Sequence, residues 1–108
     1  MAQEKPMPVA GSCLCGRVRF EVDRLIGPFE LCHCSRCRKV TGSAFAATVG
    51  AMAEDFRFLS GEAAIRSITL PVRQSPPAYR VTFCRECGSA LPAPPESGFF
   101  EIPAGLFD

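Results

Sequence analysis

GSCLCGRVRFEV, residues 11–22, combines two signals in one short stretch. In its second half apolar and charged residues alternate, which is typical of a half-buried β-strand with its apolar side chains on one face. These apolar residues are Val18, Phe20 and Val22. The first half contains Cys13 and Cys15, whose side chains would point the same way in an extended chain because they are two residues apart. The stretch therefore predicts a strand that begins beside a pair of thiols.

Five further stretches alternate in the same way or are short and apolar, as expected of strands separated by turns. They cover residues 45–49, 55–59, 65–70, 79–83 and 99–102. The segments between them are expected to be turns and loops, at residues 27–28, 38–43, 60–61, 71, 75–77 and 92–98. No window of helical length shows a sustained 3.6-residue period. The chain is therefore expected to be mostly β.

The 108 residues of the chain fit one domain. Residues 1–10 contain two prolines and little pattern, and they are expected to form a loose arm before a folded unit over residues 11–108. Phenylalanines are expected in the core of this unit rather than in a pocket, because large apolar side chains are mostly buried. The residues concerned are Phe45, Phe56, Phe58, Phe83, Phe99 and Phe100.

Seven cysteines are many for a chain of this length, and they can form disulfides or bind metal. Disulfides need an oxidising compartment, whereas the N-terminal residues show no apolar signal-peptide core. An odd number of cysteines also leaves one unpaired. Because the cysteines occur in tight groups at ligand spacing, metal binding in a reducing cytoplasm is the favoured interpretation.

The cysteines form three groups: C-x-C at Cys13 and Cys15, C-x-C-x-x-C at Cys32, Cys34 and Cys37, and C-x-x-C at Cys84 and Cys87. The C-x-x-C group, followed by Gly88, resembles a zinc knuckle, in which glycine adopts backbone angles that other residues resist. The C-x-C group is its natural partner because it too is followed by a glycine, Gly16. The C-x-x-C group can instead close on the middle group, and spacing alone does not decide between these two pairings.

Four motifs follow one another along the chain: Gly11-x-Cys13-x-Cys15-Gly16-x-Val18-x-Phe20, Cys32-His33-Cys34-x-x-Cys37-Arg38, Thr41-Gly42 and Phe83-Cys84-x-x-Cys87-Gly88. Together they resemble the glutathione-dependent formaldehyde-activating enzyme family, which centromere protein V also resembles. The resemblance covers nearly the whole chain, from Gly11 to about Asp108. It implies a β-rich, Mss-four-like fold in which folded sheets are stapled by zinc over residues 11–108.

The resemblance also implies a metal content of two zinc ions per chain, or one if the second site is left empty. A structural zinc would be held by Cys13, Cys15, Cys84 and Cys87. A second, catalytic zinc would be held by Cys32, Cys34 and Cys37. Three protein ligands leave one tetrahedral position of this second zinc open for a ligand.

Several residues near the middle group are candidates for binding a thiol substrate. Arg36 and Arg38 place positive charge beside the thiols, which would lower thiol pKa values and attract the carboxylates of a glutathione-like ligand. Thr41 and Gly42 can offer hydroxyl and backbone donors to the same ligand. The alternatives are a solvated charged surface for the arginines and a plain turn for the other two. His33, the only histidine, is expected to point away from its cysteine neighbours.

The last six residues, 103–108, look like the family's Ala-Gly-Leu-Asp segment, beyond which family members usually continue. For this chain we therefore expect a shortened sheet edge, an open pocket wall, or completion of the site by a second copy in a homodimer.

Two functions fit these features. The first, implied by the resemblance, is a zinc-dependent carbon–sulfur lyase similar to S-(hydroxymethyl)glutathione synthase, with glutathione or a similar thiol and a small aldehyde such as formaldehyde as substrates. Zinc would bind the thiol as its thiolate, which could then add to the aldehyde. The second is a non-catalytic zinc module that binds a small thiol or a protein partner.

The composition argues against two other classes of protein. A net charge of +1 and a single tyrosine do not fit a zinc ribbon that binds nucleic acid. No apolar run approaches the ~18 residues that a membrane-spanning helix needs. We therefore expect a cytoplasmic protein without a nucleic-acid or membrane partner.

Overall fold

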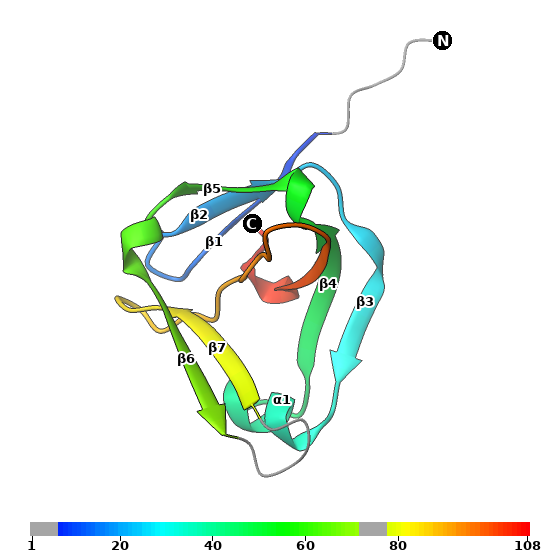
Figure 1. Ribbon diagram of the computed structural model, residues 1–108, viewed down its shortest axis with the longest axis vertical. Coiled ribbons are helices and arrows are strands. Elements are labelled where there is room, and N and C mark those ends of the chain that lie inside the picture. Colours follow the sequence, from blue (N-terminus) through cyan, green and yellow to red (C-terminus); the bar gives the residue numbers. More distant parts are fainter. Residues whose placement is uncertain (1–6, 72–77) are drawn as a thin grey trace.

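The computed structural model describes residues 7–71 and 78–108. These residues form small antiparallel sheets with one short α-helix, which confirms the predicted mostly-β class (Figure 1). The strands are β1 (Val9–Ser12), β2 (Arg19–Val22), β3 (Ile26–Cys32), β4 (Ala46–Met52), β5 (Phe56–Ser60), β6 (Ile65–Pro71), β7 (Ala78–Cys84) and β8 (Phe99–Pro103). The helix is α1 (Ser35–Thr41), and the 3-10 turns are η1 (Ala53–Asp55), η2 (Glu62–Ala64) and η3 (Ala104–Leu106).

The described strands form three sheets. The first has the order β1-β2-β5, the second has the order β3-β4-β8, and the third is the β6-β7 hairpin. In Figure 1 the first sheet lies at the top, while the hairpin and the second sheet lie on opposite sides of the molecule. The helix α1 lies between their lower ends, so the hairpin and the second sheet approach each other near this helix.

The alternating residues of the β2 stretch form the core, as the sequence predicts. Val18, Phe20 and Val22 are fully buried. The Phe20 ring stacks on Phe56 of β5 at a centroid distance of 5.3 Å and meets the ring of Phe107 edge-on at 5.7 Å. Such ring pairs add about 0.5–1.5 kcal/mol to the stability gained from burial alone. This cluster also contains buried residues of β4 and β8, so it joins the first sheet to the second.

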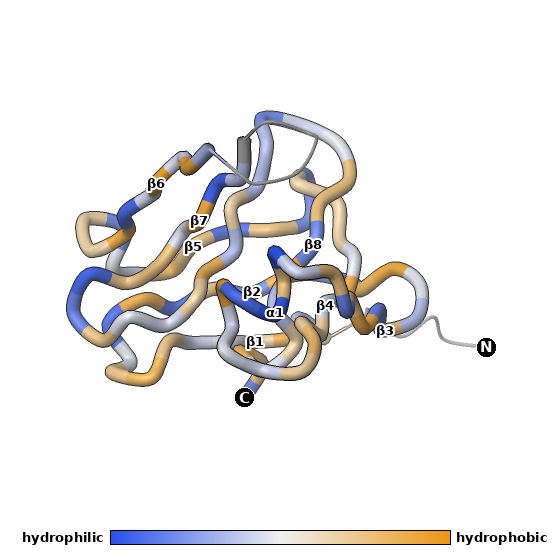
Figure 2. The backbone as a smooth tube through the Cα atoms, turned by 90° about the horizontal axis from the view of Figure 1, so that it is seen from below, coloured by the Kyte–Doolittle hydropathy of each residue, from blue (hydrophilic) through white to orange (hydrophobic). Residues whose placement is uncertain are grey.

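A second buried cluster contains two of the cysteines. Its members are Cys13, Val18, Ala64, Cys84 and Leu91. Cys13 directly follows β1 and Cys84 ends β7, so this cluster fixes the hairpin to the first sheet. The outer strand of the hairpin is exposed, and hydrophobic and hydrophilic residues alternate along β6 in Figure 2.

A loop was predicted for residues 38–43, and the helix α1 contradicts it over residues 38–41, while residues 42 and 43 lie outside the helix. It begins after Cys34, whose sulfur accepts a hydrogen bond from the Cys37 backbone N–H at 3.4 Å. It ends at Gly42, whose φ of 69° is left-handed and whose N–H donates to the Arg38 carbonyl oxygen at 2.9 Å. Seven residues are too few to show a helical period, so the pattern of apolar residues could not indicate this helix.

A bulge replaces the turn that was predicted at Gly27 and Pro28. Both residues lie inside β3, where the register with β4 shifts between Ile26 and Glu30. The φ of Gly27 is 76°, a left-handed value that lets the strand bend without reversing its direction. The prediction failed because glycine and proline mark bulges at sheet edges as well as turns.

The first strand begins at Val9, so the sheet starts within the segment predicted as a loose arm, residues 1–10. Residues 1–6 of that arm and the predicted loop at residues 75–77 lie outside the described residues. Pro71, also predicted as loop, is the last residue of β6. In the part of the chain that the structure describes, no helix is long and apolar enough to cross a membrane.

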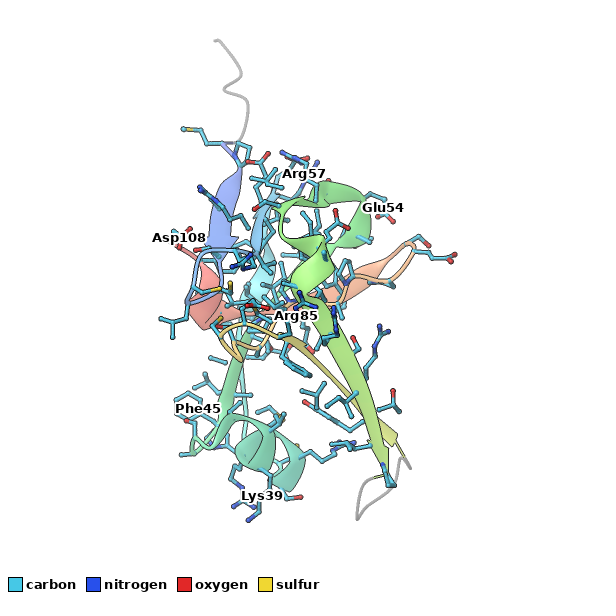
Figure 3. The ribbon with its side chains drawn as sticks, turned by 90° about the vertical axis from the view of Figure 1, so that its left-hand side faces the viewer. Lys39, Phe45, Glu54, Arg57, Arg85 and Asp108 are labelled. Atoms are coloured by element: carbon cyan, nitrogen blue, oxygen red, sulfur yellow. The ribbon has the colours of Figure 1, made fainter. Side chains whose placement is uncertain are left out.

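The phenylalanines divide between core and surface. Phe56 and Phe100 lie in the core with ring centroids 5.3 Å apart, which confirms the prediction for these two. Phe58 packs against both buried clusters, and Phe83 is half-buried. Phe45 and Phe99 are 37% and 56% exposed, so the core prediction is wrong for them. Figure 3 shows Phe45 at the α1 end of the molecule.

The turn between β5 and η2 provides a test of this fold. Gly61 has a φ of 80°, and an added Cβ would overlap the carbonyl oxygen of Arg17. Both the backbone angle and a rigid backbone neighbour therefore resist a side chain. We expect Gly61→Ala to lower the free energy of unfolding by roughly 2–4 kcal/mol, measured by denaturant unfolding followed by circular dichroism.

The control is Gly98→Ala, because Gly98 has a φ of 94° but no heavy atom within 4 Å of the new Cβ. Its free energy of unfolding should fall only by the cost of the left-handed backbone angle, about 1–2 kcal/mol. Equal losses in the two variants would contradict the close approach of Gly61 to Arg17.

Candidate metal centres

Four cysteines from opposite ends of the sequence converge in the structure. They are Cys13, Cys15, Cys84 and Cys87, here named the four-cysteine cluster, and their sulfurs all lie within 4.8 Å of one another. The Sγ atom of Cys15 is 3.6 Å from that of Cys13 and 3.9 Å from that of Cys84. Sulfurs bound to one tetrahedral zinc are about 3.8 Å apart. Spacing alone leaves two pairings open for the C-x-x-C group. In the structure this group lies beside the C-x-C group, so the pairing is between the two ends of the chain.

Each half of the four-cysteine cluster is a tight turn that ends in a glycine. The Gly16 N–H donates to the Cys13 carbonyl oxygen at 3.0 Å, and the Gly88 N–H donates to that of Cys84 at 2.7 Å. The two glycines have φ values of 77° and 78°, which residues with a Cβ rarely adopt. Cys13 and Cys15 therefore approach each other because the chain turns, which corrects the extended backbone expected between them.

A hydrogen bond joins the two turns, and further hydrogen bonds shift the pKa values of their thiols. The Leu14 backbone N–H donates to the Ser89 hydroxyl at 2.9 Å. Hydrogen bonds from the hydroxyl and backbone of Ser89 lower the pKa of Cys87 to about 5. The Arg17 backbone favours the Cys15 thiolate, but burial and the neighbouring sulfurs outweigh it and raise the pKa of Cys15 to about 11. Four adjacent thiolates need a cation among them, and this donor set suits zinc.

Cys32, Cys34 and Cys37 form a second group, the three-cysteine cluster, whose sulfurs also lie within 4.8 Å of one another. Cys32 ends β3, Cys34 precedes α1, and Cys37 lies in α1; the first two sulfurs are 3.4 Å apart. Within residues 7–71 and 78–108, no further cysteine, histidine or carboxylate joins this set. His33 is exposed, and its ring contacts Phe45 at 5.6 Å. The cluster thus offers three donors, one fewer than a closed zinc site.

The thiols of the three-cysteine cluster differ in charge. The pKa of Cys34 is lowered to about 6, chiefly because the Cys37 backbone N–H donates to its sulfur, with further help from Cys32 and Arg36. Burial raises the pKa of Cys37 to about 12, and the two neighbouring sulfurs add to this effect. Full ionisation of the cluster requires a bound cation, and three thiolates are soft ligands suited to zinc.

Arg36 lies between Cys34 and Cys37 in the sequence and reaches from α1 to the hairpin. Its guanidinium carbon is 5.9 Å from the centroid of the Tyr79 ring in β7, within the range of a cation–π contact. Its Nε atom is buried and has no hydrogen-bond partner within the described residues. Sequence reasoning missed Tyr79, because its place in an alternating strand gives no sign of what the strand faces.

A pocket of about 430 Å³ lies between the second sheet and β7, next to the three-cysteine cluster. It is lined by Glu30, Cys32, Cys37, Ala46, Thr48, Tyr79, Arg80, Thr82, Leu91, Ala93, Phe100, Glu101 and Pro103. The Thr48 hydroxyl donates to the Glu101 carboxylate at 2.7 Å, and an Arg80 Nη atom donates to the Ser67 hydroxyl at 3.3 Å. The pocket therefore presents two thiols together with charged groups of both signs.

None of the four predicted substrate residues lines this pocket; they are Arg36, Arg38, Thr41 and Gly42. Arg38 donates from Nε to the His33 carbonyl oxygen at 3.1 Å. The Thr41 hydroxyl donates to the Cys37 carbonyl oxygen at 2.7 Å, and Gly42 ends α1. These contacts shape the helix that presents Cys37, and binding of a thiol by these residues stays a prediction.

Fold and site together define a class: a small, mostly β domain with two cysteine clusters that can each hold a metal ion. Residues 8–108 match the family described as glutathione-dependent formaldehyde-activating enzyme, so the chain belongs to this family, as its motifs indicate. Among solved structures, the chain is similar to the crystal structure of a Rhodobacter sphaeroides protein, with a TM-score of 0.66 and 24% identity over 90% of this chain and 85% of the other. That likeness supports the fold. No curated protein matches the chain.

The two clusters should respond differently to loss of one cysteine. Cys84→Ser removes a ligand from a cluster that ties segments about 70 residues apart, so we expect an unfolded or insoluble domain. Cys37→Ser should fold and lose about one zinc ion per chain, because it spares the four-cysteine cluster. Metal analysis of the purified proteins and thermal unfolding followed by circular dichroism measure both effects.

Chelation of the parent protein tests the same point without a mutation. Removal of all metal should lower the melting temperature strongly, and added zinc should restore it. A well-folded, metal-free Cys84→Ser protein would contradict the structural role of this cluster.

Proposed function

We propose that this chain is a zinc-dependent carbon–sulfur lyase-like protein that joins glutathione, or a similar thiol, to a small aldehyde such as formaldehyde. The observation that carries this proposal is the three-cysteine cluster at the wall of a pocket, with no fourth protein donor among the described residues. Membership of the glutathione-dependent formaldehyde-activating family supports the choice of thiol and aldehyde.

In this proposal the two clusters have different tasks within one domain of residues 11–108. The four-cysteine cluster holds a structural zinc, and the three-cysteine cluster holds a second zinc. When bound there, the second zinc would lower the pKa of a coordinated thiol and polarise an aldehyde carbonyl as a Lewis acid. The chain's own residues bind the substrates, orient them and limit the access of water.

Charged groups in the pocket fit a thiol that is a zwitterion. Arg80 is available to a carboxylate, because within the described residues it forms no ion pair. Glu30 and Glu101 lie on the opposite side of the pocket, in β3 and β8, and are suited to an ammonium group. Glutathione carries both kinds of charge at neutral pH, so these residues could orient its thiol toward Cys32 and Cys37.

The reaction itself is a simple addition. The thiol sulfur forms a bond to the carbonyl carbon, the C=O π pair moves to oxygen, and that oxygen takes a proton to give an S-hydroxymethyl thiol. The thiol gives up one proton, so atoms and charge balance. Because the addition also proceeds in water without a catalyst, positioning of the two reactants is the main contribution that we assign to the pocket.

The alternative function is a non-catalytic zinc module that binds a small thiol or a protein partner. Exposed apolar residues of β3 favour a protein partner, because Phe29 and Leu31 are 62% and 53% exposed beside the three-cysteine cluster. A second copy of the chain is one such partner. Turnover above the uncatalysed rate, measured for formaldehyde and glutathione by NMR exchange, would favour the enzyme over this module.

We also propose that the protein works in the cytoplasm. All seven cysteines are free thiols in the structure. The two clusters place thiols within a few ångströms of one another, where an oxidising compartment would favour disulfides. A reducing compartment keeps them available as metal ligands.

Glutathione should bind the parent protein with release of a proton, because the thiol binds as its thiolate. Calorimetry in buffers of different ionisation enthalpy measures the number of protons released. Cys34→Ser should abolish this binding while the domain stays folded, since two remaining thiolates hold zinc poorly. S-methylglutathione, which lacks a free thiol, serves as the matched ligand control. Equal affinity of glutathione for Cys34→Ser and the parent would contradict the proposed site.

Arg80→Ala should weaken glutathione binding by about 1–3 kcal/mol, the usual value of a hydrogen bond to a charged group. Its control is Arg66→Ala, because Arg66 lies on the same hairpin but binds the Ala63 carbonyl oxygen and does not line the pocket. Arg66→Ala should leave the dissociation constant within twofold of the parent. If calorimetry gives the same glutathione dissociation constant for both variants, the proposed contact between Arg80 and a glutathione carboxylate is wrong.

A further inference from the structure

The outer strand of the β6-β7 hairpin has an open edge. In the described part of the chain β6 pairs with β7 alone, and Figure 1 shows β6 on the outer side of the hairpin. The ladder between the two strands runs without a shift in register from the pair Ile65 and Cys84 to the pair Pro71 and Ala78. A long, regular edge of this kind is a template on which a further strand can pair.

The other edge of β7 shows which of its backbone groups face β6. The Thr82 carbonyl oxygen accepts from the Leu91 N–H at 2.9 Å, and the Cys84 N–H donates to the Ser89 carbonyl oxygen at 2.9 Å. In an antiparallel ladder the N–H and C=O of one residue point to the same side, and this side alternates along the strand. The odd-numbered residues of β7 are therefore the ones that bond to β6.

The register then assigns the backbone groups of β6. Its even-numbered residues lie opposite the odd-numbered residues of β7 and bond to them. The N–H and C=O groups of Ser67 and Thr69 consequently point away from β7, and they have no backbone partner among the described residues. An added strand would meet these four groups first.

The side chains of β6 divide between two faces. The Ser67 hydroxyl lies 2.9 Å from that of Thr82, which lines the pocket, so this face of the hairpin is polar and points inward. Ile68 and Leu70 lie on the opposite face and are 46% and 47% exposed. Two large apolar side chains thus remain in solvent beside the open edge.

We propose that β6 pairs antiparallel with β6 of a second copy of the chain, so that the two hairpins form one four-stranded sheet centred on Ile68. In this register Ser67 of each copy bonds to Thr69 of the other, which uses the outward backbone groups of both strands. Ile68 then lies opposite Ile68, and Arg66 lies opposite Leu70. The inference is independent of the proposed function, because it involves neither cysteine cluster.

The composition of β6 favours a second copy as the occupant. Arg66 is its only charged residue, and the proposed register places the two copies of Arg66 toward opposite ends of the new ladder. No like charges therefore face each other, and the two Ile68 side chains make an apolar pair at the centre. The net charge of +1 per chain adds little repulsion between the copies.

The edge of β3 also exposes apolar side chains, but it is less suited to such pairing. Its register with β4 shifts between Ile26 and Glu30, and Pro28 within it has no N–H to donate. Bulges and prolines are features that block pairing at a sheet edge. The strand β6 has no proline before its last residue, Pro71.

Analytical ultracentrifugation of the zinc-loaded protein over a range of concentrations tests the proposal. The parent should form a dimer that dissociates on dilution. Ile68→Lys and Ile68→Glu should each be monomeric, because each new charge would face its own copy across the two-fold axis. An equimolar mixture of the two variants should dimerise, since opposite charges then face each other. Both variants should keep the circular dichroism and zinc content of the parent, because Ile68 belongs to neither buried cluster.

Thr69→Pro tests the backbone bonds of the same interface. Proline removes the N–H that points outward and spares the bonds to β7, so the dimer dissociation constant should rise by about tenfold or more in a folded protein. Thr69→Val is the matched control, because it keeps the N–H and the branched side chain, and it should dimerise as the parent does.

Three results would overturn the proposal. The first is a parent that stays monomeric at its highest soluble concentration, which would leave the β6 edge open only to an extended segment of another protein. The second is dimerisation of Ile68→Lys alone. The third is a dimer that Leu31→Lys on β3 disrupts and that neither Ile68 variant disrupts, which would assign the interface to β3.

Discussion

The convergence of four sulfurs at one point is the constraint on which the rest of the structure depends. Two tight turns, far apart in the sequence, bring their thiols within 4.8 Å of one another. Hydrogen bonds from Ser89 lower the pKa of Cys87 to about 5. The Arg17 backbone lowers the pKa of Cys15, but burial and the neighbouring sulfurs raise it to about 11, because adjacent thiolates repel one another when no cation lies between them. A metal ion held by the four sulfurs would remove this conflict and would join the first sheet to the hairpin, in a domain whose core is small.

That constraint also builds the pocket, although the four-cysteine cluster lies outside it. Cys84 fixes one end of β7, and Tyr79 precedes it by five residues, or about 17 Å of extended strand. This length carries Tyr79 and Arg80 to the side of the three-cysteine cluster. A closed cluster at one end of the hairpin thus places the wall that faces an open cluster at the other end.

The sequence predicts the features that arise from local pattern. Alternation identified the buried face of β2, and the glycines after Cys15 and Cys87 marked the two turns. The sequence pattern could not indicate α1, because seven residues are too few to show a repeating helical period of apolar positions. It also could not indicate the bulge at Gly27. Nor could it indicate that Glu101 and Tyr79 share a pocket with Cys32, because only the packing of distant strands brings them together.

Tyr79 is the only tyrosine of a chain without tryptophan, and it lies over Arg36 at the edge of the pocket. Its phenol is therefore the dominant intrinsic fluorophore of the protein, and its emission depends on this one environment. A change in the distance between the guanidinium and the ring would alter that emission without any added label. The native protein thus carries its own optical reporter of events at the three-cysteine cluster.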